Sequence, residues 1–245
     1  MRAVNLLRSA PHYRREAFHQ GLQAAGYKVL SSVQDPYPGD LLLIWNRYGG
    51  YHELACQWEQ RGATVLVAEN CPLGNDWRAG HWYSIAKTDP AIVGGVFVDY
   101  GGKRWDAWRE PLQPMREDDG ILILGQRGIG HPGIASPAQW AENAQAIHGG
   151  RIRQHPGTRI DAVSLEDDLR DIGCVYTWAS SAAIRAMRLG LWVKYMHPGF
   201  VMRDAAVTIG AEHTKTDNRL RAFQRLAWCM WELEEIRNGD AIRAV

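Results

Sequence analysis

Two short runs of uninterrupted apolar residues constrain the fold of this chain more than any other feature. The first is Leu41-Leu42-Leu43-Ile44-Trp45 and the second is Ile121-Leu122-Ile123-Leu124. A strand is apolar throughout when both of its faces are covered, as in a parallel sheet flanked by helices. A glycine-containing loop and a segment of helical spacing follow each run, and this order is typical of β-α-β units.

The same alternation extends along both halves of the chain. The expected strands cover residues 2–7, 27–31, 40–45, 63–68, 120–125, 151–155, 174–177 and 191–194. Helices are predicted over residues 11–25, 137–147 and 180–189, and a long final helix over 217–237, whose apolar residues share one face. Residues 70–119 show no regular pattern, and residues 111–119, with two prolines and several charges, suggest an interdomain linker.

Composition excludes several classes of protein. The 245 residues are 46% hydrophobic and carry a net charge of +1, which is ordinary for a globular protein and shows no overall basic excess. The four cysteines form no C-x-x-C pair, so reduced thiols are expected. No apolar run has the roughly 20 residues of a membrane span. We therefore expect a cytoplasmic protein.

Polar residues that suit a phosphorylated ligand follow three expected strands of the second half. They are Gln126-Arg127-Gly128, His155-Pro156-Gly157 and the segment from Thr177 to Ser180-Ser181. Ligands of parallel sheets bind at the carboxyl ends of the strands. A serine at the start of the next helix leaves backbone N–H groups that bind anions, and the helix dipole strengthens this binding. His155 and Arg127 are placed to donate to a phosphate and to neutralise charge on a departing group.

Neither a metal nor a bound cofactor is expected. The sequence has no Asp-x-Asp pair and no pair of histidines at helical spacing. Gly128, Gly130 and Gly133 have the spacing of a dinucleotide fingerprint, but they lie too far from the following helix and lack the acidic partner. A Rossmann-type epimerase is therefore disfavoured.

The order of these segments resembles that of capsular-polysaccharide-type glycosyltransferases of GT-B architecture. The resemblance covers residues 120–240, including the closing segment from Ala227 to Gly239. It implies an α/β, GT-B-like fold of two Rossmann-like halves with parallel sheets facing a central cleft. It also implies that His155, Ser180 and Ser181 face the donor phosphates. Similar compact enzymes occur in bacteriophages, where some modify DNA bases, and a phage-encoded enzyme of this kind is expected in the host cytoplasm. The resemblance implies a nucleotide sugar as a co-substrate and no bound cofactor.

With this resemblance we expect three regions and a defined reaction. Residues 1–113 form an acceptor-side domain, residues 114–215 a donor-binding domain, and residues 216–245 a C-terminal helix packing across the halves. The reaction moves a sugar from a nucleotide-activated donor to a hydroxyl without a metal. The donor-binding candidates are Gln126, Arg127, Gly128, His155, Thr177, Ser180 and Ser181.

The acceptor side is less defined by the sequence. Besides His155, the candidate catalytic groups are Glu69, Asp76 and His81, of which a carboxylate or an imidazole would take the proton of the acceptor hydroxyl. Acceptor-binding candidates are Asn46, Arg47, Tyr48 and Trp82.

Two acceptors and a different function class stay open. The acceptor is a glycan or a hydroxymethylated base in phage DNA, and phosphate contacts to DNA would come from a set of basic residues. These are Arg14, Arg15, Lys215, Arg219, Arg221 and Arg225. The alternative to an enzyme is a non-catalytic nucleotide-binding protein with the same fold.

Overall fold

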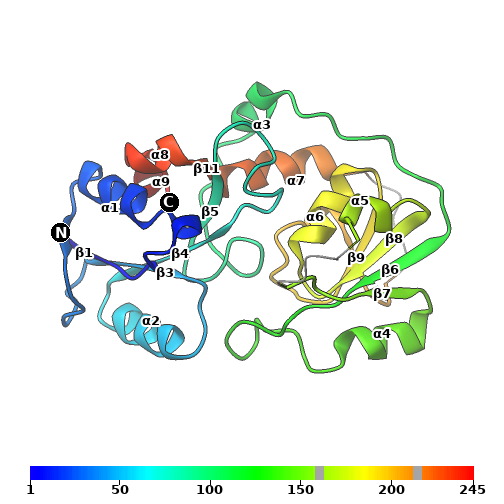
Figure 1. The fold of residues 1–245 in the computed structure, drawn as a ribbon, viewed down its shortest axis with the longest axis horizontal. Coiled ribbons are helices and arrows are strands. Elements are labelled where there is room, and N and C mark those ends of the chain that lie inside the picture. The colour runs from blue at the N-terminus through cyan, green and yellow to red at the C-terminus, as the bar shows by residue number, and fades with distance from the viewer. Residues whose placement is uncertain (158–162, 212–216) are drawn as a thin grey trace. The chain divides into compact units, whose positions relative to one another are not determined.

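The computed structural model describes residues 1–157, 163–211 and 217–245, which form two compact units (Figure 1). The N-terminal unit comprises Met1–Gly101 and Arg225–Val245, and the C-terminal unit comprises Gly102–Gln224. The expected boundary near residue 113 lies inside the C-terminal unit. The boundary expected at residues 215 and 216 lies outside the described residues, as does Lys215. In the described part of the chain no helix is long and apolar enough to cross a membrane.

The described residues of the N-terminal unit form a six-stranded sheet in the order β11-β5-β4-β3-β1-β2. Its strands are β1 (Arg2–Asn5), β2 (Lys28–Leu30), β3 (Leu41–Trp45), β4 (Thr64–Asn70), β5 (Trp82–Lys87) and β11 (Met230–Glu232). Strands β1 to β4 run parallel, as predicted. Strands β5 and β11 extend the sheet by antiparallel pairing.

Helices cover both faces of this sheet. Helix α1 (Arg15–Ala24) follows the 3₁₀ turn η1 (Pro11–Tyr13), and α2 (Gly50–Gln60) connects β3 to β4. Leu41 and Leu43 pack in the cluster that contains Phe18 of α1. Leu42 and Ile44 pack in the opposite cluster with α2. The apolar run is therefore buried on both faces, and each such side chain contributes about 1.5–3 kcal/mol.

The predicted final helix over residues 217–237 is wrong, because a strand interrupts it. The chain forms α7 (Arg219–Leu226), the 3₁₀ turn η3 (Ala227–Cys229), β11, α8 (Leu233–Arg237) and α9 (Asp240–Ala244). Met230 and Trp231 pair with β5. The side chain of Glu232 caps α8 and that of Glu235 accepts the Glu232 N–H at 2.9 Å. This capping box makes the acidic run the start of a new helix rather than the middle of a longer one.

The C-terminal unit holds a five-stranded sheet among its described residues, in the order β10-β9-β8-β6-β7 and parallel throughout. Its strands are β6 (Gly120–Leu124), β7 (Arg151–Arg153), β8 (Ile172–Thr177), β9 (Trp192–Tyr195) and β10 (Val207–Thr208). Its other elements are α3 (Lys103–Trp108), α4 (Trp140–His148), α5 (Leu165–Asp168), α6 (Ser181–Arg188) and η2 (Arg203–Ala205).

The segment expected as a linker is held against the C-terminal unit. The N–H of Arg116 donates to Gly190 O at 2.8 Å, and the N–H of Gln113 donates to Arg188 O at 2.9 Å. A Cβ atom on Gly173 would lie 1.6 Å from Asp118 O, so this close approach needs a glycine. Prolines and charges in residues 111–119 thus mark an ordered connection and not a free linker.

Candidate functional site

The order of strands in the C-terminal sheet fixes where a ligand is expected. The chain passes from β6 outward to β7, then returns to the other side of β6 to form β8. Between β6 and β8 the direction of winding changes, and ligands of such sheets bind beyond the carboxyl ends of the strands at that point. The residues that follow these two strands are Gly125-Gln126 and Trp178-Ala179.

The Gln126 side chain joins these two strand ends. Its Nε2 donates to Ala179 O at 2.9 Å, and the Ala179 N–H donates back to its Oε1 at 2.9 Å. The amide therefore makes the pair of hydrogen bonds that two neighbouring strands would exchange, at a point where β6 and β8 have already ended. We name this pair the Gln126 clasp. Gln126 thus positions two loops. It also lines the cavity described below, and its contact with a donor stays a prediction.

The long loop between β6 and α4 is held in place by further contacts. The Trp178 indole N–H donates to Ile134 O at 3.0 Å, and His197 Nε2 lies 2.6 Å from Gly133 O. His197 is buried, with 5% of its surface exposed. Between this braced loop and the start of α4 lies a cavity of about 390 Å³. Its lining includes Arg127 and Gly128, and it falls in the size range of small-molecule sites.

Arg127 and His155 supply the exposed polar groups at this edge of the sheet. The Gly157 N–H donates to His155 Nδ1 at 2.9 Å, so the proton of the neutral ring lies on Nε2. Partial burial lowers the pKa of His155, and the positive charges of Arg127 and Arg153 lower it further. His155 is thereby a neutral donor near neutral pH, beside a permanent cation.

The serine pair after β8 begins helix α6 as predicted. The Ser180 Oγ accepts the Ala182 N–H at 3.2 Å and so caps the helix. In the described residues no hydrogen bond takes up the backbone N–H of Ser181. Thr177 is fully buried at the end of β8, and its hydroxyl has no partner in that part of the chain. Neither serine lines the cavity beside Arg127, so their contact with a donor stays a prediction.

Glu69 is the most perturbed acidic group of the N-terminal unit. It lies near the carboxyl end of β4, is partly exposed, and has no ion-pair partner among the described residues. Burial raises the pKa of its carboxyl to about 7. A carboxyl with a pKa near working pH is suited to accept and release protons.

The two other acceptor-side candidates differ in their surroundings. Asp76 is exposed in the loop that follows β4. His81 is also exposed, and its Nε2 lies 2.9 Å from an Arg14 guanidinium nitrogen. Its backbone O accepts the Leu233 N–H at 2.8 Å. The loop carrying His81 is therefore tied to the start of α8.

The expected acceptor-binding residues do not share one role. Tyr48 is 41% exposed, and Asn46 adopts a left-handed backbone with φ of 59°. Arg47 is buried, and it forms a bidentate pair with Glu59 at 2.8 and 2.7 Å and also donates to Thr88 O. Trp82 is buried, and its indole N–H donates to Ala79 O at 3.1 Å. Arg47 and Trp82 therefore stabilise the unit, and we place neither in the acceptor site.

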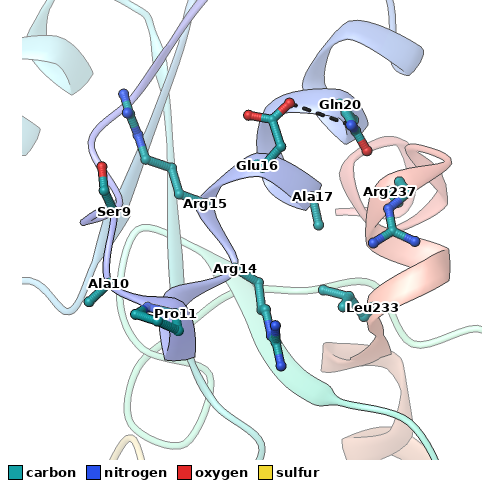
Figure 2. A pocket seen from close by; sticks show the side chains of 10 residues that line it. All are labelled: Ser9, Ala10, Pro11, Arg14, Arg15, Glu16, Ala17, Gln20, Leu233 and Arg237. Carbon is teal, nitrogen blue, oxygen red and sulfur yellow. Dashed lines mark hydrogen bonds between the residues drawn. The ribbon is translucent and has the colours of Figure 1, made fainter.

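The basic residues considered for DNA contacts are also divided. Arg219 is 6% exposed, forms an ion pair with Asp217, and donates to the carbonyls of Gln113 and Met187. It is thus bound within the C-terminal unit. Arg14 and Arg15 are exposed and line a cavity in the N-terminal unit, and Figure 2 shows their side chains pointing away from each other. In the described residues no group of three or more His, Cys, Asp or Glu could hold a metal.

A repeated triplet is the signal that the sequence analysis missed. His-Pro-Gly occurs at residues 131–133, 155–157 and 197–199. The first lies in the loop after β6, the second follows β7 and the third follows β9. In the last two the glycine N–H donates to the histidine Nδ1 at 2.9 Å. Counting the triplet would have added His197 to the candidate residues at this edge of the sheet.

Comparison with known proteins places the fold. No family model matches the sequence, and no curated protein matches it either. Among solved structures, the chain is similar to a Thermosulfurimonas dismutans KpsC, beta Kdo 2,7 transferase, with a TM-score of 0.60 and 12% identity over 98% of each chain. It is also similar to a beta Kdo 2,4 transferase of KpsC from that organism, with a TM-score of 0.58 and 14% identity. That match covers 95% of this chain and 92% of the other.

At such identities the likeness shows the fold, and it extends over nearly the whole of each chain. Together with the two sheets, it confirms the predicted architecture. The chain is an α/β protein of two Rossmann-like halves, with the fold of GT-B-like glycosyltransferases.

Proposed function

We propose that this chain is a glycosyltransferase whose C-terminal unit binds the phosphates of a nucleotide-activated sugar. The observation that carries the proposal is the Gln126 clasp, which joins the ends of β6 and β8 at the point where the sheet changes winding direction. A cavity with Arg127 in its wall lies beside it. The similarity in fold to two Kdo transferases supports the reaction class.

The groups around this edge suit a phosphate rather than a neutral ligand. Arg127 supplies a permanent charge, and the Nε2–H of His155 supplies a second donor. Gly128 has φ of 63°, a conformation that brings the loop backbone within reach of a ligand without a side chain in the way. The N–H of Ser181 at the start of α6 adds a backbone donor. These groups favour departure of a phosphate by neutralising its developing charge, which is the part a metal plays in other transferases.

For the acceptor, we propose Glu69 as the general base. Its carboxyl has a pKa raised to about 7 by burial, so its ionised form is basic enough to take a hydroxyl proton. Asp76 and His81 are the alternatives; both are more exposed than Glu69, and His81 contacts Arg14. Exchange of Glu69 for Gln should abolish transfer while nucleotide binding is retained.

A glycan is the acceptor we favour over modified DNA. The two similar structures are named as Kdo 2,7 and Kdo 2,4 transferases, and neither name mentions a nucleic acid. Arg219, one of the residues that DNA contacts would need, is buried and bound internally. Binding to duplex DNA that weakens steeply with salt would reverse this preference.

The test is a melting-temperature screen with nucleoside mono- and diphosphates and their sugar conjugates, followed by mass spectrometry of the reaction products. At least one nucleotide should raise the melting temperature of the protein. Arg127→Gln should lower the affinity for that nucleotide by about tenfold or more. Arg170→Gln is the control, because Arg170 is an exposed arginine of the same unit with an ion pair to Asp167 three residues away. Equal nucleotide affinity in the two variants, or no shift with any nucleotide, would overturn the proposal.

Turnover separates the enzyme from a non-catalytic nucleotide-binding protein. We expect slow hydrolysis of the donor sugar even without an acceptor, and we expect it to survive chelation of divalent metals by EDTA. His155→Ala should reduce this hydrolysis, since the leaving phosphate loses a donor. Binding without any hydrolysis or transfer would support the non-catalytic alternative.

A further inference from the structure

The loop between β6 and α4 forms much of the wall of the cavity of about 390 Å³ in the C-terminal unit. No backbone carbonyl of the described residues accepts the N–H groups of four successive members of this loop, Arg127, Gly128, Ile129 and Gly130. The first two of them line the cavity. Backbone N–H groups of a glycine-containing loop after a parallel strand bind phosphate where the loop is held in one conformation. What holds this loop therefore decides whether it can bind an anion.

The loop does not fix its own position. Gly128 and Gly130 have φ of 63° and 142°, conformations that glycine adopts without strain. Farther along the loop, the His131 carbonyl accepts the Ile134 N–H at 3.0 Å and the Ala135 N–H at 3.1 Å. These bonds close a turn but tie it to no other element. Because ordering a glycine-containing segment costs conformational entropy, contacts from elsewhere in the unit must stabilise the loop.

Two side chains that follow neighbouring strands make such contacts. His197 Nε2 lies 2.6 Å from Gly133 O, and the Trp178 indole N–H donates to Ile134 O at 3.0 Å. Because the Gly199 N–H donates to His197 Nδ1, the proton of the neutral ring lies on Nε2, and this nitrogen is the donor to Gly133 O. Two consecutive carbonyls of the turn are thus bonded by side chains beyond β8 and β9. We name His197 and Trp178 the loop brace.

The loop brace is itself ordered by the sheet. The His197 N–H donates to Trp178 O at 3.1 Å, which continues the pairing of β8 with β9 past their ends. The two rings contact each other edge to face, with centroids 5.4 Å apart. His197 is buried, and Trp178 packs against the core cluster that contains Trp140 of α4. Packed rings with bonded nitrogens have little rotamer freedom, so the brace fixes the loop relative to the sheet.

We propose that His197 and Trp178 are positioning residues that hold this loop so that the backbone N–H groups of Arg127 and Gly128 bind a phosphate of the donor. The inference rests on the proposed function and deepens it, because it assigns phosphate binding to the loop backbone and the ordering of the loop to two residues outside the cavity lining. A loop ordered beforehand spares the ligand the entropy of ordering it. Loss of a brace bond therefore weakens donor binding although every group that touches the donor is still present.

The test measures dissociation constants by calorimetry for whichever of CMP, UDP and GDP raises the melting temperature most. His197→Phe keeps a planar ring and removes the Nε2–H. We expect its affinity for the nucleotide to fall about three- to tenfold, as for the loss of one hydrogen bond. His197→Gln restores a donor, because its amide nitrogen takes the position of Nε2. This variant should bind the nucleotide about as tightly as the unaltered protein does.

His148→Phe is the matched control for this exchange. His148 ends α4, and its ring contacts that of Tyr176 with centroids 5.0 Å apart. Since α4 leads into β7, which runs parallel to β6, His148 lies at the opposite edge of the sheet from the loop. Its exchange should leave the nucleotide affinity unchanged.

Trp178→Phe tests the second brace contact independently, and it keeps the proposal testable if His197→Phe does not fold. It retains an aromatic ring and removes the N–H that Ile134 O accepts. We expect the same loss of nucleotide affinity. In both brace variants the amides of Ile134 and Ala135 should exchange hydrogen faster, whereas the Val175 amide in β8 should keep its protection.

The possible results separate failure of this inference from failure of the proposed function. The inference would be overturned if either brace variant bound the nucleotide as tightly as His148→Phe does, or if His197→Gln bound it as weakly as His197→Phe. In both cases nucleotide binding by the unaltered protein would stand. Absence of any nucleotide effect in the unaltered protein would instead overturn the proposed function.

Discussion

The Gln126 clasp can be tested by changing one atom, the side-chain nitrogen of Gln126. In Gln126→Glu the side chain keeps its shape, and the oxygen that accepts the Ala179 N–H is retained. The nitrogen that donates to Ala179 O at 2.9 Å becomes an oxygen, so an ionised carboxylate faces a carbonyl oxygen. We expect the C-terminal unit to be destabilised and its two loops to separate.

The expected cost follows from the two hydrogen bonds, both of them partly buried. A single intramolecular hydrogen bond contributes about 0.5–1.5 kcal/mol, so the clasp as a whole contributes about 1–3 kcal/mol. The introduced carboxyl loses one bond and adds repulsion, which places the loss at pH 8 in that same range. Protonation restores a donor, so the folded state raises the pKa of this group above its unfolded value of about 4.3. The loss is therefore absent at a pH below that value and grows as pH rises through it.

Urea unfolding of the full chain at pH 8 and at the lowest pH where it stays folded measures this loss. Hydrogen exchange of the Ala179 amide, which should lose protection at pH 8, locates it. Gln145→Glu is the matched control, because Gln145 also donates to a backbone carbonyl at 2.9 Å but is exposed. The control should change stability by no more than about 0.5 kcal/mol. The proposed role of the clasp would be refuted if the loss in free energy of unfolding did not vary with pH, or if it equalled that of the control.

Two further predictions concern the N-terminal unit and the ordered connection. Burial raises the pKa of Glu69 from 4.5 to about 7, so its neutral form is favoured in the fold and stability falls as pH rises through that interval. Glu69→Gln should therefore raise the melting temperature relative to the unaltered protein at pH 8 and leave it unchanged near pH 4; an equal difference at both values would contradict this. Gly173→Ala places a Cβ atom 1.6 Å from Asp118 O and should cost more than about 2 kcal/mol by urea unfolding. Gly50→Ala, which meets no atom within 4 Å at the start of α2, should cause no loss, and a similar loss in both would refute the close approach.

The parallel strands β3 and β6 were predictable because each contains a run of consecutive apolar residues and leads through a loop to a helix. Strand β3 is the clearest case, since its alternate residues pack in two different clusters on opposite faces of the sheet. Strand β5 was not predictable from the same rule. Its residues Trp82 to Lys87 mix aromatic and polar types, and their strand conformation depends on pairing with β4 and β11. Such pairing joins residues far apart in the sequence, and no local pattern records it.

The final helix failed for a related reason. Apolar residues at helical spacing occur from Leu220 to Ile236, but three of them in succession, Cys229, Met230 and Trp231, are buried together. Burial of consecutive side chains is typical of a strand with both faces covered and not of one helical face. The acidic run after Glu232 then supplies a capping box, a local signal that was present in the sequence.

The donor site shows which residue types reveal their role in sequence and which do not. Arg127 and Ser180 were expected at the ends of strands, and each lies there. Gln126 was also expected at the donor, and the structure shows a second role that the sequence did not indicate, because its amide exchanges two hydrogen bonds with Ala179. A side-chain amide forms hydrogen bonds with a backbone as readily as with a ligand. The sequence alone therefore does not show that the Gln126 amide bonds to the neighbouring loop.

The His-Pro-Gly turn is repeated at this edge of the sheet, and the histidines of its copies have different surroundings. In two copies the glycine N–H occupies the histidine Nδ1, which places the ring proton on Nε2 and directs it away from the turn. His197 is buried, and its Nε2 meets Gly133 O at 2.6 Å, so this copy holds the loop of the first copy in place. His155 is exposed, and its Nε2–H remains available beside Arg127. Burial therefore separates a histidine that holds a loop in place from one whose Nε2–H stays exposed, where we propose that it contacts the donor.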